Sequence, residues 1–318
     1  MATFLIRRTI GAILVMLAVT FIVFLIFIIV PGGGKLGTAQ RIAGKNATPQ
    51  NVLNIEHAWG FDKPFYVQYG LMIKRMFTNN LVSYTSQQPV LSQIKQGIPA
   101  TFSLTIGAAL IWVFFGVLVG VISAVTAGRL SDRLITILAL VGISMPVFWL
   151  GLVTRYLLAE KNSFFPDGEY YPLTANPLQW AYHLILPWLV LAVLFIGFYG
   201  RVLRGNILDT INEDYVRTAK AKGLAAKRVL VKHVLRNSLI PIVTLFGLDF
   251  AGVLGGGAIL TETVFDLHGV GQYAAQSINN FDLPPIMGVT MYGAFFIVLF
   301  SVLVDIFYAF LDPRIRPT

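Results

Sequence analysis

The sequence contains no cysteine and little charge, and each absence narrows what the chain can be. Without cysteine there is no disulfide, no thiol nucleophile and no cysteine-bound zinc or iron–sulfur cluster. Charged residues make up 12% of the 318 residues, about half of the roughly 25% that is typical of soluble proteins. This is too little charge to solvate a soluble enzyme of this length, and 24 phenylalanines exclude a disordered chain. The remaining class is an integral membrane protein.

Motifs of nucleotide, metal and hydrolytic chemistry are also missing. A Walker A loop ends in Gly-Lys-Ser or Gly-Lys-Thr, but Gly34-Lys35 is followed by leucine and Gly44-Lys45 by asparagine. The four histidines are scattered, with no H-E-x-x-H pair, and no serine stands in G-x-S-x-G. The glycine clusters miss the dinucleotide fingerprint. We therefore expect no catalytic, cofactor-binding or metal-binding residue, and no enzymatic activity in this chain.

Six long stretches are nearly free of Asp, Glu, Lys and Arg, and each can supply a spanning helix of about 20 residues. None alternates polar and apolar residues at period 2, so all six are predicted to be helices. The first is too long for the apolar core of a signal peptide, so we expect it to remain uncleaved. A short helix is expected ahead of the second. The stretches are 9–30, 98–128, 134–154, 183–200, 238–261 and 283–304, the last extending to about 310.

The distribution of lysine and arginine predicts the orientation, because cytoplasmic loops of membrane proteins carry an excess of these residues. With the N-terminus inside, the inner segments hold 15 of the 24 lysines and arginines, nine of them within 201–236. The outer loops 159–182 and 263–282 hold only Lys161. The outer stretch 31–97 holds seven, but it exceeds about 60 residues, the length beyond which the rule loses force. Both termini are therefore predicted to be cytoplasmic. The net charge of +9 is then explained by these loops, and no nucleic-acid partner is expected.

This topology divides the chain into three parts. Residues 1–30 form a tail and the first span, and residues 31–97 form an extracytoplasmic region. Residues 98–318 form a five-span core that contains the cytoplasmic segment 201–238. Within the outer region, residues 61–69 are expected to lead into an amphipathic helix that runs to about Phe77, with aromatic residues at the membrane interface.

The cytoplasmic segment 201–238 is predicted to form two helices around a glycine. Asn212 can cap the first helix, and the acidic pair Glu213 and Asp214 then lies at its positive end. Gly223 stands where a left-handed residue ends a helix. The basic charge of this pair of helices has two interpretations, a surface that rests on anionic lipid or a docking element for a cytoplasmic protein.

Three carboxylates fall at or near membrane depth, where an ionisable side chain is costly and usually has a partner or lines a water-filled path. Asp305 lies near the inner end of the last span, where a local structural contact is expected. Glu262 lies near the outer end of the fifth span, and a hydrogen bond at the helix end explains it best. Asp249 lies deeper, and a structural pairing and a role in a pathway are equally supported. Small residues at Gly116-x-x-x-Gly120 and Gly252-x-x-x-Gly256 predict close helix packing. The further glycines around Gly256 indicate a crowded or moving interface.

The cytoplasmic segment also carries a family resemblance. Residues 214–224, Asp-Tyr-Val-Arg-Thr-Ala-Lys-Ala-Lys-Gly-Leu, followed by 235–241, Leu-Arg-Asn-Ser-Leu-Ile-Pro, resemble the EAA loop of ATP-binding-cassette (ABC) importer permeases. The branch it looks like serves dipeptides, oligopeptides and nickel. Further similarities follow in order along the chain, at 62–69, 98–101, 144–148, 186–187, 262–265, 268–271 and 311–314. The chain departs from the branch after Pro31, where three glycines replace Gly-Asp-Pro, and at 79–82.

The resemblance implies an all-α integral membrane protein with six spanning helices, a multi-pass permease subunit in a bacterial or archaeal plasma membrane. It implies a second, similar permease, two cytoplasmic ATPase subunits that bind ATP and Mg²⁺, and a solute-binding protein that delivers peptides. Nickel or an oligosaccharide remains an alternative cargo, and a stand-alone secondary transporter an alternative class. The implied ATPase-coupling residues are Asp214, Tyr215, Arg217, Ala219, Lys220 and Gly223, and the candidates for a pathway or gate are Asp249, Gly256 and Glu262.

Overall fold

The computed structural model describes residues 2–26, 39–40, 43, 48–280 and 282–311. Throughout this part the chain is helical, and its one β interaction is an isolated bridge between Val82 and Pro89. The all-α class expected from the sequence is confirmed. The chain forms two compact units, one of residues 1–98 and 269–318 and the other of residues 99–268.

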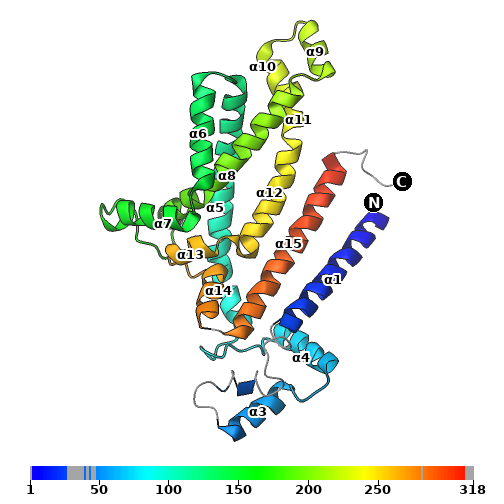
Figure 1. The fold of residues 1–318 in the computed structure, drawn as a ribbon, viewed down its shortest axis with the longest axis vertical. Helices are drawn as coiled ribbons and strands as arrows, with labels where there is room; N and C mark the ends of the chain where they lie inside the picture. The colour runs from blue at the N-terminus through cyan, green and yellow to red at the C-terminus, as the bar shows by residue number, and fades with distance from the viewer. Residues whose placement is uncertain (1, 27–38, 41–42, 44–47, 281, 312–318) are drawn as a thin grey trace. The chain divides into compact units, whose positions relative to one another are not determined.

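The first unit is organised around two long helices, α1 (Ala2–Phe24) and α15 (Leu283–Leu311), which run side by side (Figure 1). Apart from Arg7 and Arg8 of α1 and Asp305 of α15, both helices are largely apolar, as expected of helices in lipid. A small core joins them to α4, with Phe24 fully buried beside Met72 and Met291. The expected sixth span, 283 to about 310, is confirmed by α15.

Two helices precede the second span in this unit. Thr48 caps α3 (Pro49–Trp59) by accepting a hydrogen bond from the backbone N–H of Asn51, and Gly60 ends it at φ 74°. The α4 helix (Phe65–Phe77) follows after Pro64. A helix that ends at about Phe77 was predicted and is confirmed, whereas α3 was not anticipated from the sequence.

A buried carboxylate ties together the loops of the first unit. Asp282, 3% exposed, precedes α15 and accepts three hydrogen bonds from the loop before α5. The donors are the Ser83 hydroxyl at 2.5 Å and the backbone N–H groups of Tyr84 at 3.0 Å and Thr85 at 3.1 Å. Burial, and then the Asp282 charge, raise the pKa of the Tyr84 hydroxyl. The segment 263–282 was predicted to be an outer loop, but ten of its residues form the helix α14 (Val270–Asn279).

The second span is longer than predicted. The sequence suggested a short helix followed by a span from residue 98, near the start of the stretch free of charged residues. Instead α5 (Val90–Val125) runs without interruption through Pro99. Proline inside a helix is tolerated in membranes, where neighbouring groups satisfy the freed carbonyl. The boundary between the two units falls within this helix, between Ile98 and Pro99.

In the second unit α5 packs closely on α8 (Pro177–Thr210) at small residues. A Cβ added at Gly116 would lie 2.8 Å from the Cβ of Tyr199, and one at Gly120 would lie 2.9 Å from the carbonyl oxygen of Gly200. The close approach predicted for this glycine pair is confirmed. Trp112 of α5 is fully buried and stacks on Phe195 of α8 with ring centroids 4.4 Å apart.

The predicted third span is not one straight helix. The α6 helix (Leu130–Ser144) ends before Pro146, and the chain continues as α7 (Val147–Arg155) and a π-helical turn (Tyr156–Glu160), bent by 96° from α6. Met145 has extended backbone angles, the conformation that a following proline imposes. At about 1.5 Å per residue α6 is about 22 Å long, less than the roughly 30 Å of a hydrocarbon core.

The fifth span also breaks. The helix α12 (Ile240–Gly252) passes into a π-helical turn (Val253–Gly257), and a separate helix, α13 (Ile259–Val264), follows. Five helices in the described residues can cross a membrane by length and composition, or six if α6 and the segment after its bend are counted as one span. The six-span prediction agrees with the second count.

Candidate functional site

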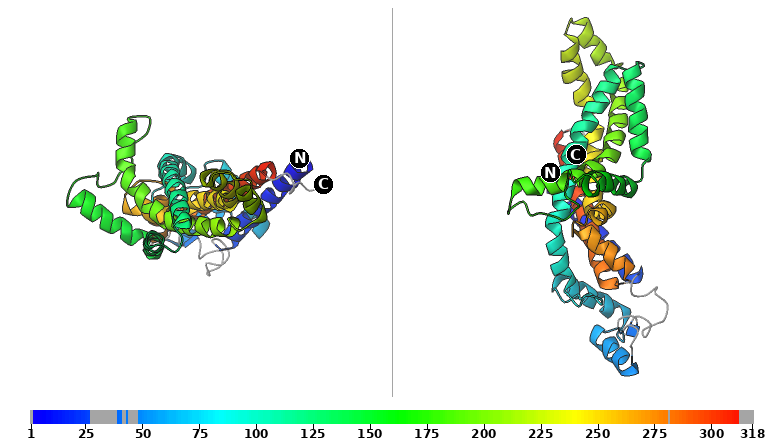
Figure 2. Two further views of the ribbon diagram at one scale, coloured as in Figure 1. Left: turned by 90° about the horizontal axis from the view of Figure 1, so that it is seen from above. Right: turned by 90° about the vertical axis from the view of Figure 1, so that its left-hand side faces the viewer.

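The segment that carries the family resemblance begins where α8 ends. It contains α9 (Asp214–Ala221), α10 (Ala226–Val229), a π-helical turn (Leu230–Leu235) and α11 (Arg236–Ser238), and then leads into α12. Figure 1 and the right-hand view of Figure 2 show that α9 and α10 extend beyond the end of α8. The two-helix prediction is confirmed, including its second helix starting next to Ala225.

The prediction for the C-terminal end of α9 is confirmed, whereas the prediction for its N-terminal end is wrong. Gly223 has φ 76°, and the chain leaves the helix in a Schellman motif: Gly223 N–H bonds to Lys220 C=O at 2.9 Å and Leu224 N–H to Ala219 C=O at 3.4 Å. The predicted left-handed glycine is therefore confirmed. The predicted cap at Asn212 is wrong, since the N-cap residue is Glu213 and the Asn212 side chain instead donates to the Leu208 carbonyl of α8.

Opposite faces of α9 have opposite environments. Val216 and Ala219, three residues apart, are buried in the core of the second unit together with Val229 and Val234. The other predicted coupling residues are exposed: Asp214, Tyr215, Arg217 and Lys220. Ala219 therefore holds α9 in place and is not available to a partner. The exposed ion pair between Arg217 and Asp214, at 3.6 Å, adds little to stability.

Hydrogen bonds fasten this segment to the spanning helices. The Asn237 side chain of α11 donates to the Tyr215 hydroxyl of α9 at 2.6 Å. Next to it, the Ser238 hydroxyl bonds to the Asn206 carbonyl of α8 at 3.2 Å, and the Asn206 side chain donates to the Ser238 carbonyl at 3.3 Å. These bonds link α9 to α11 and α11 to α8, and α11 leads directly into α12.

The gate candidates lie along the broken fifth span. Gly256 has φ 137°, far outside the helical region, in the π-helical turn between α12 and α13. A residue with a Cβ is strongly disfavoured at this angle. In this chain a Cβ at Gly252 would meet nothing within 4 Å. The close packing predicted for the Gly252-x-x-x-Gly256 pair is therefore not found within the described residues. Gly256 instead provides the positive φ at the break between α12 and α13.

Asp249 lies one turn before this break. Its Oδ2 accepts a hydrogen bond from the Tyr199 hydroxyl of α8 at 2.8 Å. The residue is partly exposed, and in the described part of the chain it forms no ion pair with lysine or arginine. The structure thus supplies a structural partner for Asp249, while the carboxylate keeps access to the surface of the unit.

Glu262 follows the break, in α13, and is fully buried. Its Oε1 accepts a hydrogen bond from the Thr101 hydroxyl of α5 at 2.7 Å. The backbone carbonyl of Glu262 also accepts a bond from the N–H of Leu267. The expected hydrogen bonding at the helix end is found, and it joins α13 to α5 rather than facing an open path.

Comparison with known proteins identifies the fold. Residues 116–317 match the family described as the inner membrane component of binding-protein-dependent transport systems, and residues 1–105 match its N-terminal region. The chain belongs to this permease family. It is therefore a multi-pass component of a bacterial plasma membrane, and its family is that of ABC importer permeases.

Curated relatives match this permease along almost its whole length. A dipeptide transport system permease of Alkalihalophilus pseudofirmus is 34% identical, covering 99% of this chain and 100% of the relative. A peptide transport permease of Brucella abortus, itself named putative, is 36% identical over 99% of each chain. A probable D,D-dipeptide permease of Escherichia coli is 36% identical over 97% of this chain and 96% of the relative.

The permease contains an ion pair that sequence reasoning missed. Arg204 of α8 donates from Nε and Nη2 to the two oxygens of Asp132 on α6, both at 2.8 Å. Asp132, 3% exposed, also accepts bonds from the Ser123 hydroxyl at 2.5 Å and the Gly128 N–H at 2.9 Å. The site joins α5, α6 and α8 near the segment that carries α9. The only sequence signal was an aspartate at the start of an apolar run.

A second missed contact closes the opposite end of the same unit. Arg155 donates to the carbonyl of Val264, the last residue of α13, and, at 2.7 Å, to Asp167 in the loop before α8. This arginine holds the pKa of Asp167 below its usual range. The same loop bonds through the N–H of Glu169 to the Phe265 carbonyl at 3.0 Å. The loop predicted at 159–182 is thus an ordered cap on α13.

Proposed function

We propose that this chain forms one half of the translocation pathway of an ABC importer for peptides. Its relatives bear the names of dipeptide and peptide permeases along nearly the full length of both chains. The observation that carries the proposal is the two-sided α9. One face is buried against the spanning helices, and the other presents charged and aromatic groups at the far end of the unit.

In this proposal α9 is the coupling helix, seated in a groove of a cytoplasmic ATPase subunit. Tyr215, Arg217 and Lys220 contact the ATPase, while Val216 and Ala219 keep α9 fixed to the permease. Two ATPase subunits bind the ATP and Mg²⁺, and their closure moves α9. The links from α9 through α11 to α8 and α12 convert that movement into rocking of the spans, the rigid-body alternation of transporters.

The orientation follows from the same assignment. With α9 on the cytoplasmic side, both termini are cytoplasmic and residues 31–97 lie outside. The ordered cap around Glu169 and the exposed Gln276 of α14 then face the solute-binding protein that delivers the peptide. A second, similar permease subunit completes the pathway.

The broken fifth span supplies the gate. Gly256 allows α12 and α13 to change their relative direction, and Asp249 borders the break on the α12 side. Irregular backbone at membrane depth is tolerated where it is buried in protein or lines a path. Glu262 anchors α13 to α5 so that the movement is confined to the glycine-rich turn.

The decisive measurement is uptake of labelled peptides into vesicles that contain both permease subunits, the ATPases and the binding protein. We expect uptake to need ATP and binding protein. Uptake of Ni²⁺ or an oligosaccharide in place of peptides would replace peptides as the assigned cargo. Uptake driven by a proton gradient without ATP would overturn the proposal. Cross-linkers placed at Glu169 or Gln276 should capture the binding protein, and capture of none would leave these loops as structural caps.

A further inference from the structure

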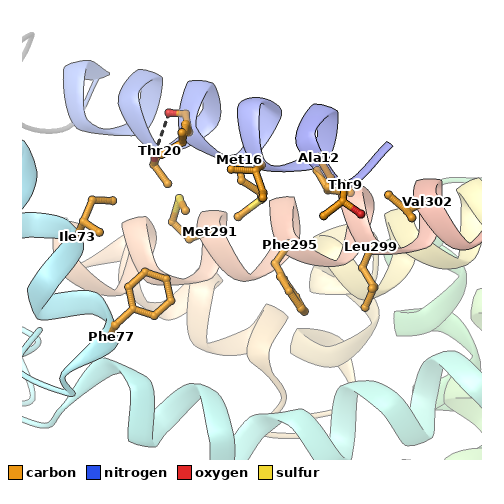
Figure 3. Close-up of a pocket in the computed structure, with 13 residues that line it drawn as sticks. Thr9, Ala12, Met16, Thr20, Ile73, Phe77, Met291, Phe295, Leu299 and Val302 are labelled. Atoms are coloured by element: carbon orange, nitrogen blue, oxygen red, sulfur yellow. Dashed lines mark hydrogen bonds between the residues drawn. The ribbon is translucent and has the colours of Figure 1, made fainter. Parts of the chain in front are cut away.

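We propose that a groove in the first unit holds one acyl chain of an anionic phospholipid, with its headgroup at Arg7 and Arg8. The groove runs between α1 and α15 and has a volume of about 390 Å³ (Figure 3). This lies within the range of small-molecule sites. The site is separate from the coupling helix and the gate, and it does not depend on the cargo of the transporter.

The lining of the groove selects hydrocarbon. On α1 it is formed at Thr9, Ala12, Met16 and Thr20, the spacing of one helical face. The facing residues of α15, from Met291 to Val302, are all apolar. The Thr20 hydroxyl is already bonded to the Leu17 carbonyl at 2.8 Å and to the Tyr69 hydroxyl at 2.6 Å. A polar ligand would leave its own groups unsatisfied here.

The length of the groove matches one leaflet. Thr9 and Thr20 are eleven residues apart, which is about 16 Å along a helix. Half of the hydrocarbon core of a bilayer is about 15 Å. At the Thr20 end Ile73 and Phe77 of α4 also line the groove.

Positive charge is placed at the open end. The Arg8 guanidinium donates from Nη2 to the Ser301 hydroxyl of α15 at 3.0 Å, next to Val302 in the lining. It is thereby held between the two helices that form the walls. Arg7 is exposed beside it. A guanidinium matches a phosphate in charge and geometry, and each basic residue near the membrane surface favours anionic lipid by about fivefold.

The competing occupant is an apolar helix of a neighbouring subunit. A helix with its side chains is about 10–12 Å across, and it would bring no group that needs two arginines at its end. A phospholipid satisfies both features, because its chain is apolar and its headgroup is anionic.

The test uses the complete transporter in nanodiscs of equal phosphatidylglycerol and phosphatidylcholine. Native mass spectrometry then counts the lipids that remain bound after gentle extraction. Ala12→Trp and Val298→Trp fill the groove from its two walls. The matched control is Leu14→Trp, on the same helix but 60% exposed and outside the lining. Wild type and control should retain one phosphatidylglycerol per copy of this chain, which the two groove variants lose.

The headgroup is tested by Arg8→Gln, which should lower the preference for phosphatidylglycerol over phosphatidylcholine about fivefold while a lipid remains bound. Co-purification of the other subunits shows that each variant assembles, and one assembling groove variant suffices. Equal lipid counts in Ala12→Trp and Leu14→Trp, or no headgroup preference in wild type, would overturn the proposal. So would a cysteine at Val298 that forms a disulfide with a cysteine in a neighbouring subunit's helix.

Discussion

Arg204 and Asp132 form a two-pronged ion pair in which both N–H···O distances are 2.8 Å. The pair connects α8 to α6 and lies close to the start of the segment that carries α9. Removing one member of a buried pair strands the other charge, which costs about 3–5 kcal/mol in fully buried cases. Arg204 is 31% exposed, so water offsets part of this cost.

We therefore expect Arg204→Gln to destabilise the permease by about 3 kcal/mol, the low end of that range. The measurement is the unfolding temperature of the purified complex. Arg217→Gln is the matched control, because its ion pair with Asp214 is exposed and contributes at most about 1 kcal/mol. Equal shifts in both variants would show that the buried pair has no special structural role.

Single cysteines can test the orientation without interference, because the chain has none of its own. A cysteine at Lys222, just after α9, and one at Gln50, in α3, should react with an impermeant maleimide from opposite sides of the membrane. Both positions are exposed, so reactivity is not limited by burial. Labelling of both from one side would contradict the six-span topology.

Gly223→Val tests coupling through the turn that ends α9. A Cβ at Gly223 would meet nothing within 4 Å, so its cost is the left-handed backbone, about 1–2 kcal/mol. This is too little to unfold the protein but enough to tilt α9. We expect the variant to insert and assemble normally while peptide uptake falls at least tenfold relative to ATP hydrolysis.

The control for this prediction is Gly205→Val in α8. Gly205 also has open space around its Cβ position, but its backbone is helical, so only the conformational requirement differs. Wild-type uptake and wild-type stimulation of hydrolysis in Gly223→Val would mean that the turn has no part in coupling.

Asp249→Asn separates the two interpretations of the intramembrane carboxylate. Asparagine can still accept the hydrogen bond from Tyr199, so a structural role predicts little change in stability or uptake. A pathway role predicts normal assembly with uptake reduced, because the charge is gone. Tyr199→Phe keeps the charge and removes the hydrogen bond. It should lower the unfolding temperature if the role of Asp249 is structural, and it should leave uptake unchanged if Asp249 acts in the pathway. Uptake is measured in vesicles, with the unfolding temperature followed in parallel.

Features set by local chemistry were predictable from the sequence. Apolar runs located the spanning helices, and a glycine after a charged helix predicted the left-handed Gly223. The close packing at Gly116 followed from the spacing of small residues. Each of these depends on a few neighbouring residues, so a single sequence contains the required information.

Features set by contacts between distant segments were not predictable. Asp132 pairs with a residue 72 positions away, and Asp282 with a loop about 200 positions away. The bend of the third span depends on Pro146, but α5 and α8 continue as helices through Pro99 and Pro187. Whether a proline bends a helix is decided by the packing around it, which the sequence alone does not state. The same holds for Ala219, whose burial only the folded segment defines.

Gly252 and Gly256 of the fifth span should respond differently in a library that places every amino acid at each position. Gly256 should reject nearly every other amino acid, because its φ of 137° is a requirement of its own backbone. Gly252 is helical, and a Cβ there would meet nothing within 4 Å among the described residues, so alanine fits in this part of the chain. Rejection of alanine at position 252 would therefore report atoms outside the described residues, as the proposed partner permease would supply. The tolerance at that one codon measures whether the partner permease packs against α12, with no structure of the complex needed.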